Sequence, residues 1–239
     1  MIGAVGSVAT MSESAAADFD AIYRGESPIE NMTSPPWDIG EPQPAITNLV
    51  AAGRVHNPVL DAGCGTGDTA RYLAERGFTV TGIDGSPTAI ATARDRAQQH
   101  GLNNVEFVVA DVTTFDVARP QFGTVLDSTL YHSLAVSARE PYFAAIHRSC
   151  LPGASLHILC FSTQAPFPAD QPGPNLLSEQ ELRDSFGRHW ILDELTAATI
   201  TSHLPGSAPD SVRAELDSDE HGRVLLPGWL ASAHRNDEL

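Results

Sequence analysis

Three glycines alternate in one short run of the chain, and an aspartate stands just before them. The run is Val59-Leu60-Asp61-Ala62-Gly63-Cys64-Gly65-Thr66-Gly67. Alternating glycines let a backbone pass close to a ligand and leave amide N–H groups pointing at it. A carboxylate at Asp61 suits an amino group of that ligand. Because turns use glycine freely, this loop alone is weak evidence, and its surroundings decide what it predicts.

The first supporting signal is Asp84, which closes the next apolar run, in Thr81-Gly82-Ile83-Asp84-Gly85-Ser86-Pro87. It lies 21 residues after Gly63. At that distance a carboxylate binds the hydroxyl pair of a ribose in nucleotide-binding folds. The ligand is therefore predicted to be a nucleoside derivative.

Two further aspartates close the next two apolar runs. Asp111 can accept a hydrogen bond from the exocyclic amine of adenine, with the Val112 amide on a ring nitrogen. Asp127, followed by Ser128, is expected beside the reacting end of the ligand. A single aspartate at such a place is at least as often a helix N-cap. Four in register are harder to explain by capping, since the carboxyl ends of parallel strands converge on the ligand crevice.

A nicotinamide dinucleotide is the rival ligand. Its loop is spaced G-x-G-x-x-G and seats a pyrophosphate on the helix start. The present spacing is G-x-G-x-G, and Asp61 would repel a pyrophosphate. The dinucleotide interpretation is therefore rejected.

The elements around these residues alternate between strand and helix. Strands are predicted at 59–62, 78–83, 105–110, 124–128, 155–161, 190–200 and 224–234. Helices are predicted at 18–24, 44–52, 68–75, 87–97, 139–150 and 179–186, the last opened by a capping box of Ser178 and Glu181. Apolar strands separated by helices indicate a parallel sheet covered on both faces.

We therefore predict one α/β domain, a Rossmann-like doubly wound fold with a mostly parallel seven-stranded sheet and an N-terminal helical cap. Residues 1–17 are predicted to be flexible, and 18–239 to form the domain. Within it, 18–54 is the cap, 55–165 the cofactor-binding core, and 166–239 the C-terminal part of the sheet and its loops.

Composition excludes several classes. The 239 residues include 30 acidic side chains and 14 basic ones, all arginine, for a net charge of −16. Without lysine, neither a Schiff-base lysine nor a P-loop lysine is available. A field this negative disfavours nucleic acid and membrane surfaces and tolerates a cationic sulfonium, although solubility alone also explains it. Three sparse cysteines suggest a cytosolic protein, and the histidines show no metal-ligand spacing, so no metal is predicted.

The residues named so far resemble the motifs of the class I methyltransferases. Val59–Gly67 matches their first motif, and Asp84, Asp111 and Asp127 fall on the three that follow, over roughly 55–165. The resemblance implies S-adenosylmethionine as cofactor, with product S-adenosylhomocysteine. Its methionine part would be held by Asp61 and the loop, its ribose at Asp84, and its adenine at Asp111 and Val112. Cys64 is then a packing residue, since cysteine is common at this family position.

A second resemblance concerns the run Pro36-Trp37-Asp38-Ile39-Gly40-Glu41-Pro42-Gln43-Pro44. It is similar to the cap of the thiol, halide and thiopurine methyltransferases, in which the matching tryptophan packs over the cofactor. An indole face attracts cations and excludes water, although Trp37 could also be a plain packing anchor.

Closest is the resemblance to mycobacterial-type heterocyclic toxin methyltransferases acting on hydroxyquinolones, carried by Phe19–Glu26, the Trp37 cap and Asp127–Ser133. It implies methylation of a small aromatic heterocyclic acceptor on oxygen or nitrogen, in detoxification or tailoring. A thiol or halide methyltransferase, or a non-catalytic S-adenosylmethionine-binding module, is the alternative.

His132 lies five residues after Asp127, where the acceptor is expected. A histidine could remove the acceptor proton as a general base. It could equally be a core or supporting histidine, and an acidic N-hydroxyl, a thiol or a halide would need no base. Tyr23, Tyr131, Phe161 and Phe167, with His132 and with Trp37 as roof, could line an apolar acceptor pocket, although scattered aromatics are more often core.

Overall fold

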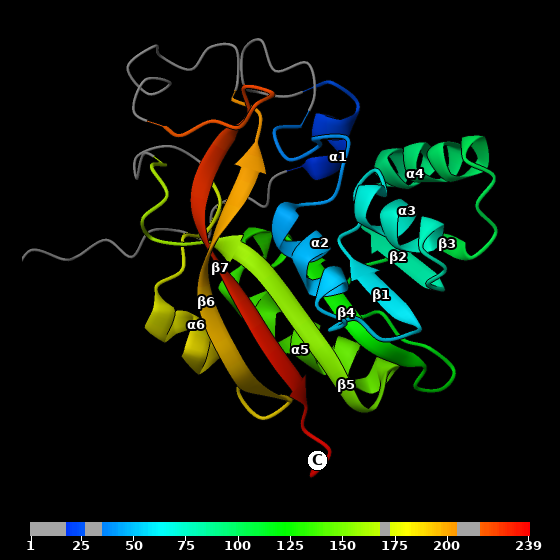
Figure 1. Ribbon diagram of the computed structural model, residues 1–239. Coiled ribbons are helices and arrows are strands. Elements are labelled where there is room, and N and C mark those ends of the chain that lie inside the picture. The colour runs from blue at the N-terminus through cyan, green and yellow to red at the C-terminus, as the bar shows by residue number, and fades with distance from the viewer. Residues whose placement is uncertain (1–17, 27–34, 168–172, 205–215) are drawn as a thin grey trace, which may run out of the picture.

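Seven strands form one sheet in the computed structural model, which describes residues 18–26, 35–167, 173–204 and 216–239 (Figure 1). Their order is β3-β2-β1-β4-β5-β7-β6. The five strands β1 to β5 run parallel, and β7 is antiparallel to both β5 and β6. The predicted mostly parallel, seven-stranded fold is confirmed. The strands are β1 Val59–Ala62, β2 Val80–Asp84, β3 Val105–Val109, β4 Phe122–Ser128, β5 Cys150–Phe161, β6 Trp190–Ser202 and β7 Val224–Arg235.

Helices cover both faces of this sheet. Successive side chains of a strand point to opposite faces, and because the strands are apolar throughout, both faces must be shielded from water. On β1, Val59 belongs to an apolar cluster that includes residues of α2, α3 and α4, whereas the next residue, Leu60, belongs to one that includes residues of α5 and α6. The helices are α1 Phe19–Tyr23, α2 Pro44–Ala51, α3 Asp68–Glu75, α4 Pro87–Gln99, α5 Val136–Ser149 and α6 Glu179–Ser185, with a short 3₁₀ helix η1 at Tyr131–Ser133.

Several element boundaries differ from those predicted by one or two residues, and two differ by three or more. Helix α5 begins at Val136 rather than Arg139. Strand β5 begins at Cys150, so that Pro152 and Gly153 lie within it. The reason is a bulge, since the pairing between β4 and β5 shifts register between Phe122 and Thr124 and so extends the ladder back to Cys150. The capping box of Ser178 and Glu181 is present as predicted.

The segment that joins α1 to α2 is fastened to the far edge of the sheet. The Gln43 side chain exchanges two hydrogen bonds of 2.8 Å with the backbone of Thr201, near the end of β6. The Pro36 carbonyl accepts from the Ser202 hydroxyl and the His203 amide. The cap therefore contacts two separate parts of the protein. Its helix α1 contacts α4, and the segment before α2 contacts β6. Its predicted limits at 18 and 54, like the other domain subdivisions, stay predictions.

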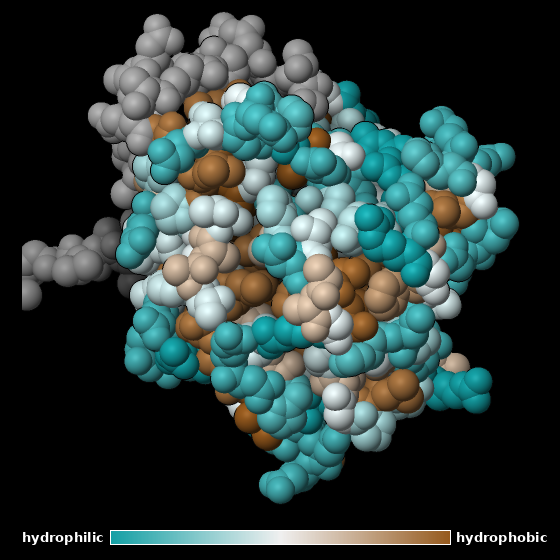
Figure 2. Space-filling view, viewed as in Figure 1, coloured by the Kyte–Doolittle hydropathy of each residue, from teal (hydrophilic) through white to brown (hydrophobic). Residues whose placement is uncertain are grey.

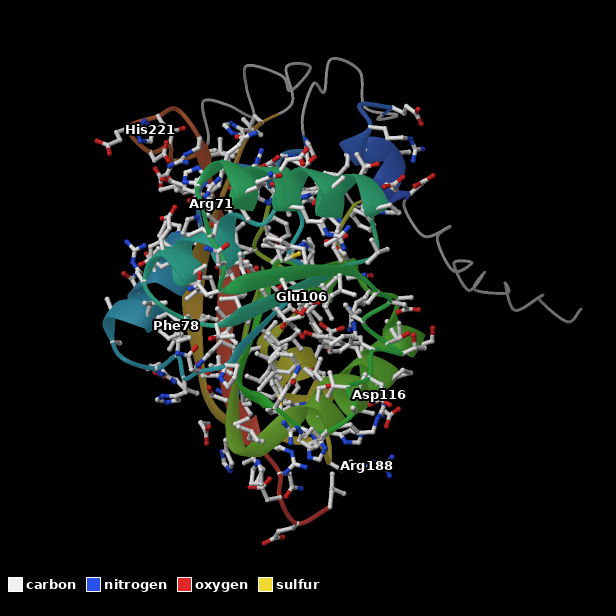
Figure 3. The ribbon with its side chains drawn as sticks, turned by 90° about the vertical axis from the view of Figure 1, so that its right-hand side faces the viewer. Arg71, Phe78, Glu106, Asp116, Arg188 and His221 are labelled. Carbon is white, nitrogen blue, oxygen red and sulfur yellow. The ribbon has the colours of Figure 1, made fainter. Side chains whose placement is uncertain are left out.

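The surface is largely polar. Hydrophilic residues cover most of the face seen in Figure 2, with apolar residues in smaller patches between them. Figure 3 looks onto the edge strand β3, where Glu106 lies exposed. No helix within the described residues is long and apolar enough to cross a membrane. The predicted flexible stretch 1–17 lies outside the described residues.

Candidate active site

The glycine loop connects β1 to α3 in a backbone that only glycine readily adopts. Gly63, Gly65 and Gly67 have φ values of +68°, +53° and +86°. A Cβ at Gly65 would lie 2.7 Å from the Tyr23 hydroxyl, and one at Gly63 would lie 2.8 Å from Leu130 Cβ. The loop therefore requires glycine both for its conformation and for the close approach of its neighbours.

Asp61 presents an unsatisfied carboxylate oxygen at the start of this loop. Its side chain is buried, and Oδ2 has no hydrogen-bond partner. Burial, with Asp84 and Asp127 nearby, raises the pKa of Asp61 to about 7. A buried carboxylate without a partner is costly, and an ammonium group would relieve that cost. The amino group of S-adenosylmethionine fits this requirement.

Asp84 organises the turn at the end of β2. Its two oxygens accept from the Gly65 amide at 2.9 Å and the Ser86 amide at 2.8 Å. Gly85 between them is exposed, and the Ser86 hydroxyl caps α4 by accepting from the Ala89 amide. A carboxylate oxygen can accept more than one hydrogen bond, so the predicted ribose contact of Asp84 is compatible with this geometry.

Asp111 and Val112 lie at the end of β3, where the predicted adenine contacts would be made. Asp111 is exposed, and its Oδ1 accepts from the amide and the hydroxyl of Thr113, both at 2.8 Å. Val112 is buried against the core. The carboxylate thus stiffens the turn through one of its oxygens.

The side chain of Asp127 points into the protein interior, a direction that its position in the sequence did not predict. Its side chain is fully buried, and it accepts from the Leu130 and Tyr131 amides and from the Tyr142 hydroxyl. This carboxylate shapes the turn after β4 rather than facing open space. Ser128 is half-buried. The next residue, Thr129, has φ of +77°, a strained conformation for a β-branched residue.

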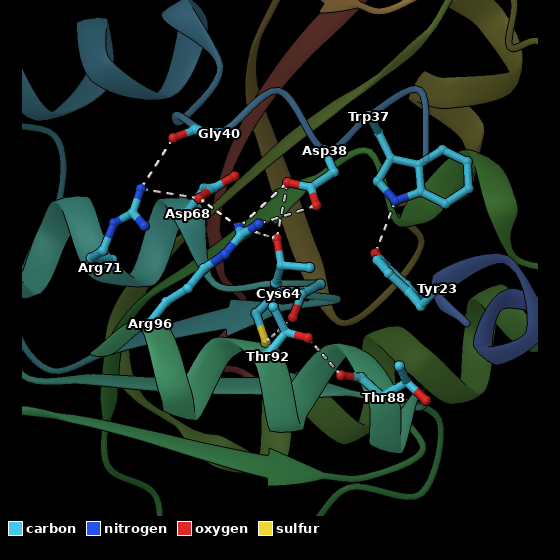
Figure 4. Close-up of polar contacts among 12 residues, drawn as sticks. Tyr23, Trp37, Asp38, Gly40, Cys64, Asp68, Arg71, Thr88, Thr92 and Arg96 are labelled. Carbon is cyan, nitrogen blue, oxygen red and sulfur yellow. Dashed lines mark hydrogen bonds and ion pairs between the residues drawn. The ribbon is translucent and has the colours of Figure 1, made fainter. Parts of the chain in front are cut away.

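Trp37 and Tyr23 form one unit above the glycine loop. The Trp37 indole N–H donates to the Tyr23 hydroxyl at 2.9 Å (Figure 4). Phe19 packs edge-on against the indole. Burial raises the pKa of Tyr23 far above its usual value. Because the Tyr23 hydroxyl lies over Gly65, the geometry associates Tyr23 with the cofactor loop rather than with the predicted acceptor pocket.

A polar network that the sequence analysis missed fastens this unit. Asp38 accepts from the Thr66 hydroxyl at 3.0 Å and pairs with Arg96 at 3.4 Å. Arg96 also pairs with Asp68 at 3.2 Å, and Arg71 bridges Asp68 to the cap at the Gly40 carbonyl (Figure 4). Burial and the Asp38 carboxyl raise the pKa of Asp68 to about 6. The network joins the Trp37 segment, the glycine loop, α3 and α4.

Asp20, also missed, fastens α1. Its Oδ1 accepts from the Ser86 hydroxyl at 2.6 Å and the Thr88 amide at 3.0 Å. These hydrogen bonds lower the pKa of Asp20 to about 2. No local pattern signals either contact, since the partners are 66 and 68 residues away in sequence.

His132 is buried at the carboxyl end of the sheet. Its Nδ1 accepts from the Phe161 amide at 3.2 Å, and its ring stacks on Phe161 with centroids 4.5 Å apart. Burial, with the Arg139 charge, lowers the pKa of His132 to about 3. A neutral histidine whose Nδ1 accepts carries its proton on Nε2. Nε2 is therefore a hydrogen-bond donor, and the ring is poorly suited to the predicted role of general base.

The other aromatics of the predicted acceptor pocket separate into two places. Phe167 packs edge-on against Phe161 with centroids 4.9 Å apart, which extends the platform begun by His132. Tyr131 is fully buried and stacks on Phe143 at 5.4 Å, beside Tyr142. That packing is typical of core, so the structure gives Tyr131 no open surface toward an acceptor.

Cys64 packs inside the loop. Its Sγ would lie 2.9 Å from a Cβ at Gly82, and burial raises its pKa well above the usual value, which makes it a poor nucleophile.

Among the described residues, no group of three or more His, Cys, Asp or Glu side chains could hold a metal ion. A surface hollow of about 390 Å³ is lined by the cap residues before α2, by α2 and by α3.

Comparisons with known proteins agree with this geometry. Residues 59–153 match the family described as methyltransferase domain. A curated relative from Mycobacteroides abscessus, 2-heptyl-1-hydroxyquinolin-4(1H)-one methyltransferase, is 43% identical over 95% of this chain and 100% of its own length. The chain belongs to the class I S-adenosylmethionine-dependent methyltransferases, and it is a small-molecule methyltransferase.

Solved structures show the same architecture. One, described as conversion of a disulfide bond into a thioacetal group during echinomycin biosynthesis, is 37% identical with a TM-score of 0.77 and 91% coverage of both chains. A second is 1,6-didemethyltoxoflavin-N1-methyltransferase from Burkholderia thailandensis, with S-adenosylhomocysteine bound. It is 24% identical with a TM-score of 0.58, covering 81% of this chain and 77% of that one, and shows the fold alone.

Proposed function

We propose that this enzyme methylates a small aromatic heterocycle of the hydroxyquinolone type, on oxygen or nitrogen. The observation that carries the proposal is the aromatic platform of His132, Phe161 and Phe167 at the carboxyl end of β5. His132 and Phe161 are buried and Phe167 is half-buried, so a flat heterocycle would stack on the Phe167 side of this platform. The relative from M. abscessus, named for a 1-hydroxyquinolinone, supports the same class of acceptor. A detoxification or tailoring role, and a cytosolic location in keeping with three free cysteines, belong to this proposal.

The cofactor would lie along the carboxyl ends of β1 to β4. Bound there, S-adenosylmethionine supplies an electrophilic methyl group on a sulfonium. Asp61 would hold its amino group, the backbone at Gly63, Gly65 and Gly67 would approach its methionine part, and Trp37 would cover the sulfonium. The Asp84–Gly85–Ser86 turn would receive the ribose, and the Asp111–Val112 turn the adenine.

The chain's own residues would act by placement. Methyl transfer is an in-line displacement, so the enzyme mainly aligns the acceptor and excludes water. We assign His132 the role of a donor from Nε2 to an acceptor oxygen, in place of a base, because its Nδ1 is already occupied by the Phe161 amide.

A labelled-methyl transfer assay tests this proposal. The panel comprises 2-heptyl-1-hydroxyquinolin-4(1H)-one, a phenol, an amine, a thiol and iodide, each at saturating cofactor. We expect the N-hydroxyquinolone to give the highest kcat/KM. Cofactor binding without transfer to any acceptor would instead indicate a non-catalytic binding module.

Sulfur is the second candidate for the methylated atom. It is favoured by the 37% identity to the structure that concerns a disulfide and a thioacetal. The same panel separates the two candidates, because thiol or iodide turnover above that of the hydroxyquinolone would reverse their order.

A further inference from the structure

The hydroxyl group of Tyr23 carries a proton for which the described part of the chain offers no acceptor. Its one hydrogen bond there comes from the Trp37 indole N–H, at 2.9 Å, so in that bond the Tyr23 oxygen is the acceptor. An indole nitrogen only donates and cannot take the tyrosine proton in return. The proton is therefore left for solvent or for a ligand.

The hydroxyl end of Tyr23 points at the glycine loop. A Cβ at Gly65 would lie 2.7 Å from the Tyr23 oxygen and 3.7 Å from the ring carbon that bears this oxygen. The oxygen, and not the ring, is therefore the part of Tyr23 that reaches the loop. Trp37 approaches the same oxygen from the cap (Figure 4). The Tyr23 hydroxyl thus lies between the cap and the loop that is expected to hold the cofactor.

Much of the hydrogen-bonding capacity of the loop is used within the protein. The Cys64 amide donates to the Ile83 carbonyl, and the Gly67 amide donates to the Cys64 carbonyl, both at 2.9 Å. The Gly65 amide donates to Asp84 at the same distance. These bonds fix the shape of the loop, and they leave fewer amide N–H groups for a ligand than its glycines suggest. An anion bound at the loop therefore needs a donor from outside it.

The arginines of α1, α3 and α4 that lie nearest the cap are also engaged within the protein. Each one pairs with carboxylates: Arg24 with Asp20 and Glu26, Arg71 with Asp68, and Arg96 with Asp38 and Asp68. None of these cations is left without an internal partner. A neutral O–H donor, the Tyr23 hydroxyl, is then the group that the cap offers to an anion at the loop.

S-adenosylmethionine would bring an anion to this place. Its amino group fits the unsatisfied oxygen of Asp61, two residues before Gly63. The amino and carboxylate groups of the methionine part are bonded to the same carbon atom. An amine held at Asp61 therefore keeps the carboxylate close to the loop, where it requires hydrogen-bond donors.

We propose that Tyr23 donates its hydroxyl proton to the methionine carboxylate of the cofactor, as the middle member of a relay that begins at the Trp37 indole N–H. The inference rests on the proposed function, which places the cofactor at the loop. In such a chain each hydrogen bond polarises and strengthens the next. The carboxylate therefore tightens the contact between Tyr23 and Trp37, and the cap distinguishes the complete cofactor from adenosine derivatives that lack the carboxylate.

The test compares two ligands that differ by one carboxylate. These are S-adenosylhomocysteine and its decarboxylated analogue, 5′-deoxy-5′-(3-aminopropylthio)adenosine, each titrated calorimetrically into the full-length protein. Tyr23→Phe should raise the Kd of S-adenosylhomocysteine about 10- to 100-fold, the range for a lost hydrogen bond to a charged group. The Kd of the analogue should stay within about twofold. Tyr72→Phe is the matched control, because the Tyr72 ring of α3 lies under the Arg76 guanidinium and away from the loop.

Each other result decides against the proposal. Equal weakening of both ligands would mean that the hydroxyl contacts another part of the cofactor or only holds the cap. Unchanged affinity for both would remove Tyr23 from the cofactor site.

A second measurement uses the wild-type protein and decides the question even if Tyr23→Phe does not fold. The indole N–H resonance of Trp37 is assigned by its loss in Trp37→Phe and followed by NMR. S-adenosylhomocysteine should move it further downfield than the decarboxylated analogue does, because a Tyr23 hydroxyl that donates to a carboxylate is a stronger acceptor. Equal shifts with the two ligands would overturn the relay.

Failure of the proposed function is a separate outcome. It would appear as absence of labelled-methyl transfer by the wild-type enzyme to every acceptor in the panel. The ligand comparison at Tyr23 requires no turnover and remains readable in that case. A wild-type protein that binds neither ligand would overturn both the placement of the cofactor and the role of Tyr23.

Discussion

At the scale of single residues, the site is defined by two side chains whose chemistry burial has changed. Asp61 is buried with one oxygen unsatisfied, and His132 is buried with its proton placed by a backbone amide. Asp61 is poorly solvated without a ligand, and an ammonium group would supply the interaction that its free oxygen lacks. Such a site lowers the stability of the ligand-free protein and increases its affinity for the ligand.

Asp61→Asn should stabilise the ligand-free protein and weaken cofactor binding. The pKa of Asp61 is raised to about 7 by burial, so keeping it ionised above that pH is unfavourable. At pH 8 we expect the variant to gain about 2 kcal/mol, roughly 4–8 °C in Tm. Its Kd for S-adenosylhomocysteine should rise at least about tenfold. Calorimetry and thermal melts measure both, and a variant that melts lower while binding equally well contradicts this interpretation.

His132 is tested by two amides that imitate its two nitrogens. His132→Asn retains an acceptor near Nδ1 and loses the Nε2 donor, whereas His132→Gln retains a donor near Nε2. If Nε2 orients the acceptor, Asn should lower kcat/KM about 2- to 12-fold, the value of one neutral hydrogen bond, and Gln less. Cofactor Kd should persist in both. Since the pKa of His132 is about 3, wild-type kcat should show no titration of this group between pH 5.5 and 8. A step near pH 6.5 that disappears in both variants would restore the base.

At the scale of elements, the sequence predicted regular structure and missed long-range polar contacts. Apolar runs such as Val59–Ala62 and the Ser178 capping box are local signals, and both were present as predicted. The pairing of Arg96 with Asp38 spans 58 residues and leaves no periodic trace. In the same way, the position of Asp127 at a strand end predicted where the residue lies in the sheet but not the direction of its side chain. That direction is determined by the Tyr142 hydroxyl and two backbone amides.

Arg96 on α4 should control how firmly the Trp37 segment is held. Arg96→Gln removes its pairs with Asp38 and Asp68, and the neighbouring carboxylates are then left to repel each other. We expect the KM for S-adenosylmethionine to rise about 5- to 30-fold, as for a coupling of 1–2 kcal/mol, with a smaller change in kcat. Arg94→Gln, on the same helix but bonded to the Phe107 carbonyl, is the control. Equal KM values in the two variants would show that the network does not act on the cofactor.

At the scale of the whole molecule, buried ionisable groups have opposite effects on the stability of the folded state as pH falls. The side chain of His157, a residue of β5, is buried between the Ser232 hydroxyl and the Arg54 carbonyl, and burial lowers its pKa to about 4. Its neutral form therefore contributes stability above the unfolded pKa near 6.5, which is lost as pH falls toward 4. Asp61 and Asp127, whose pKa values are raised to about 7, act in the opposite sense and favour the folded state as pH falls.

Removal of His157 should expose this balance. His157→Gln can keep hydrogen bonds to both neighbours and does not titrate. As pH falls from 7.5 to 5, the variant should lose less stability than the wild type. The difference in the free energy of unfolding should be about 1–2 kcal/mol, which corresponds to roughly 2–8 °C in Tm. Parallel pH-dependent melts of the two proteins give the comparison. Curves that stay parallel over this range would mean that His157 does not contribute to acid sensitivity.

The exposed turn at Asp111 has a practical consequence for chemical tools. Asp111 lies in the open beside the edge strand β3, whereas Tyr23 and Trp37 cover the glycine loop at the other end of the proposed cofactor site. A linker carried on the adenine amine would therefore leave the protein without crossing its core. Resin-bound or fluorescent cofactor analogues built at that position should be retained, while analogues enlarged at the sulfonium would have to displace the cap.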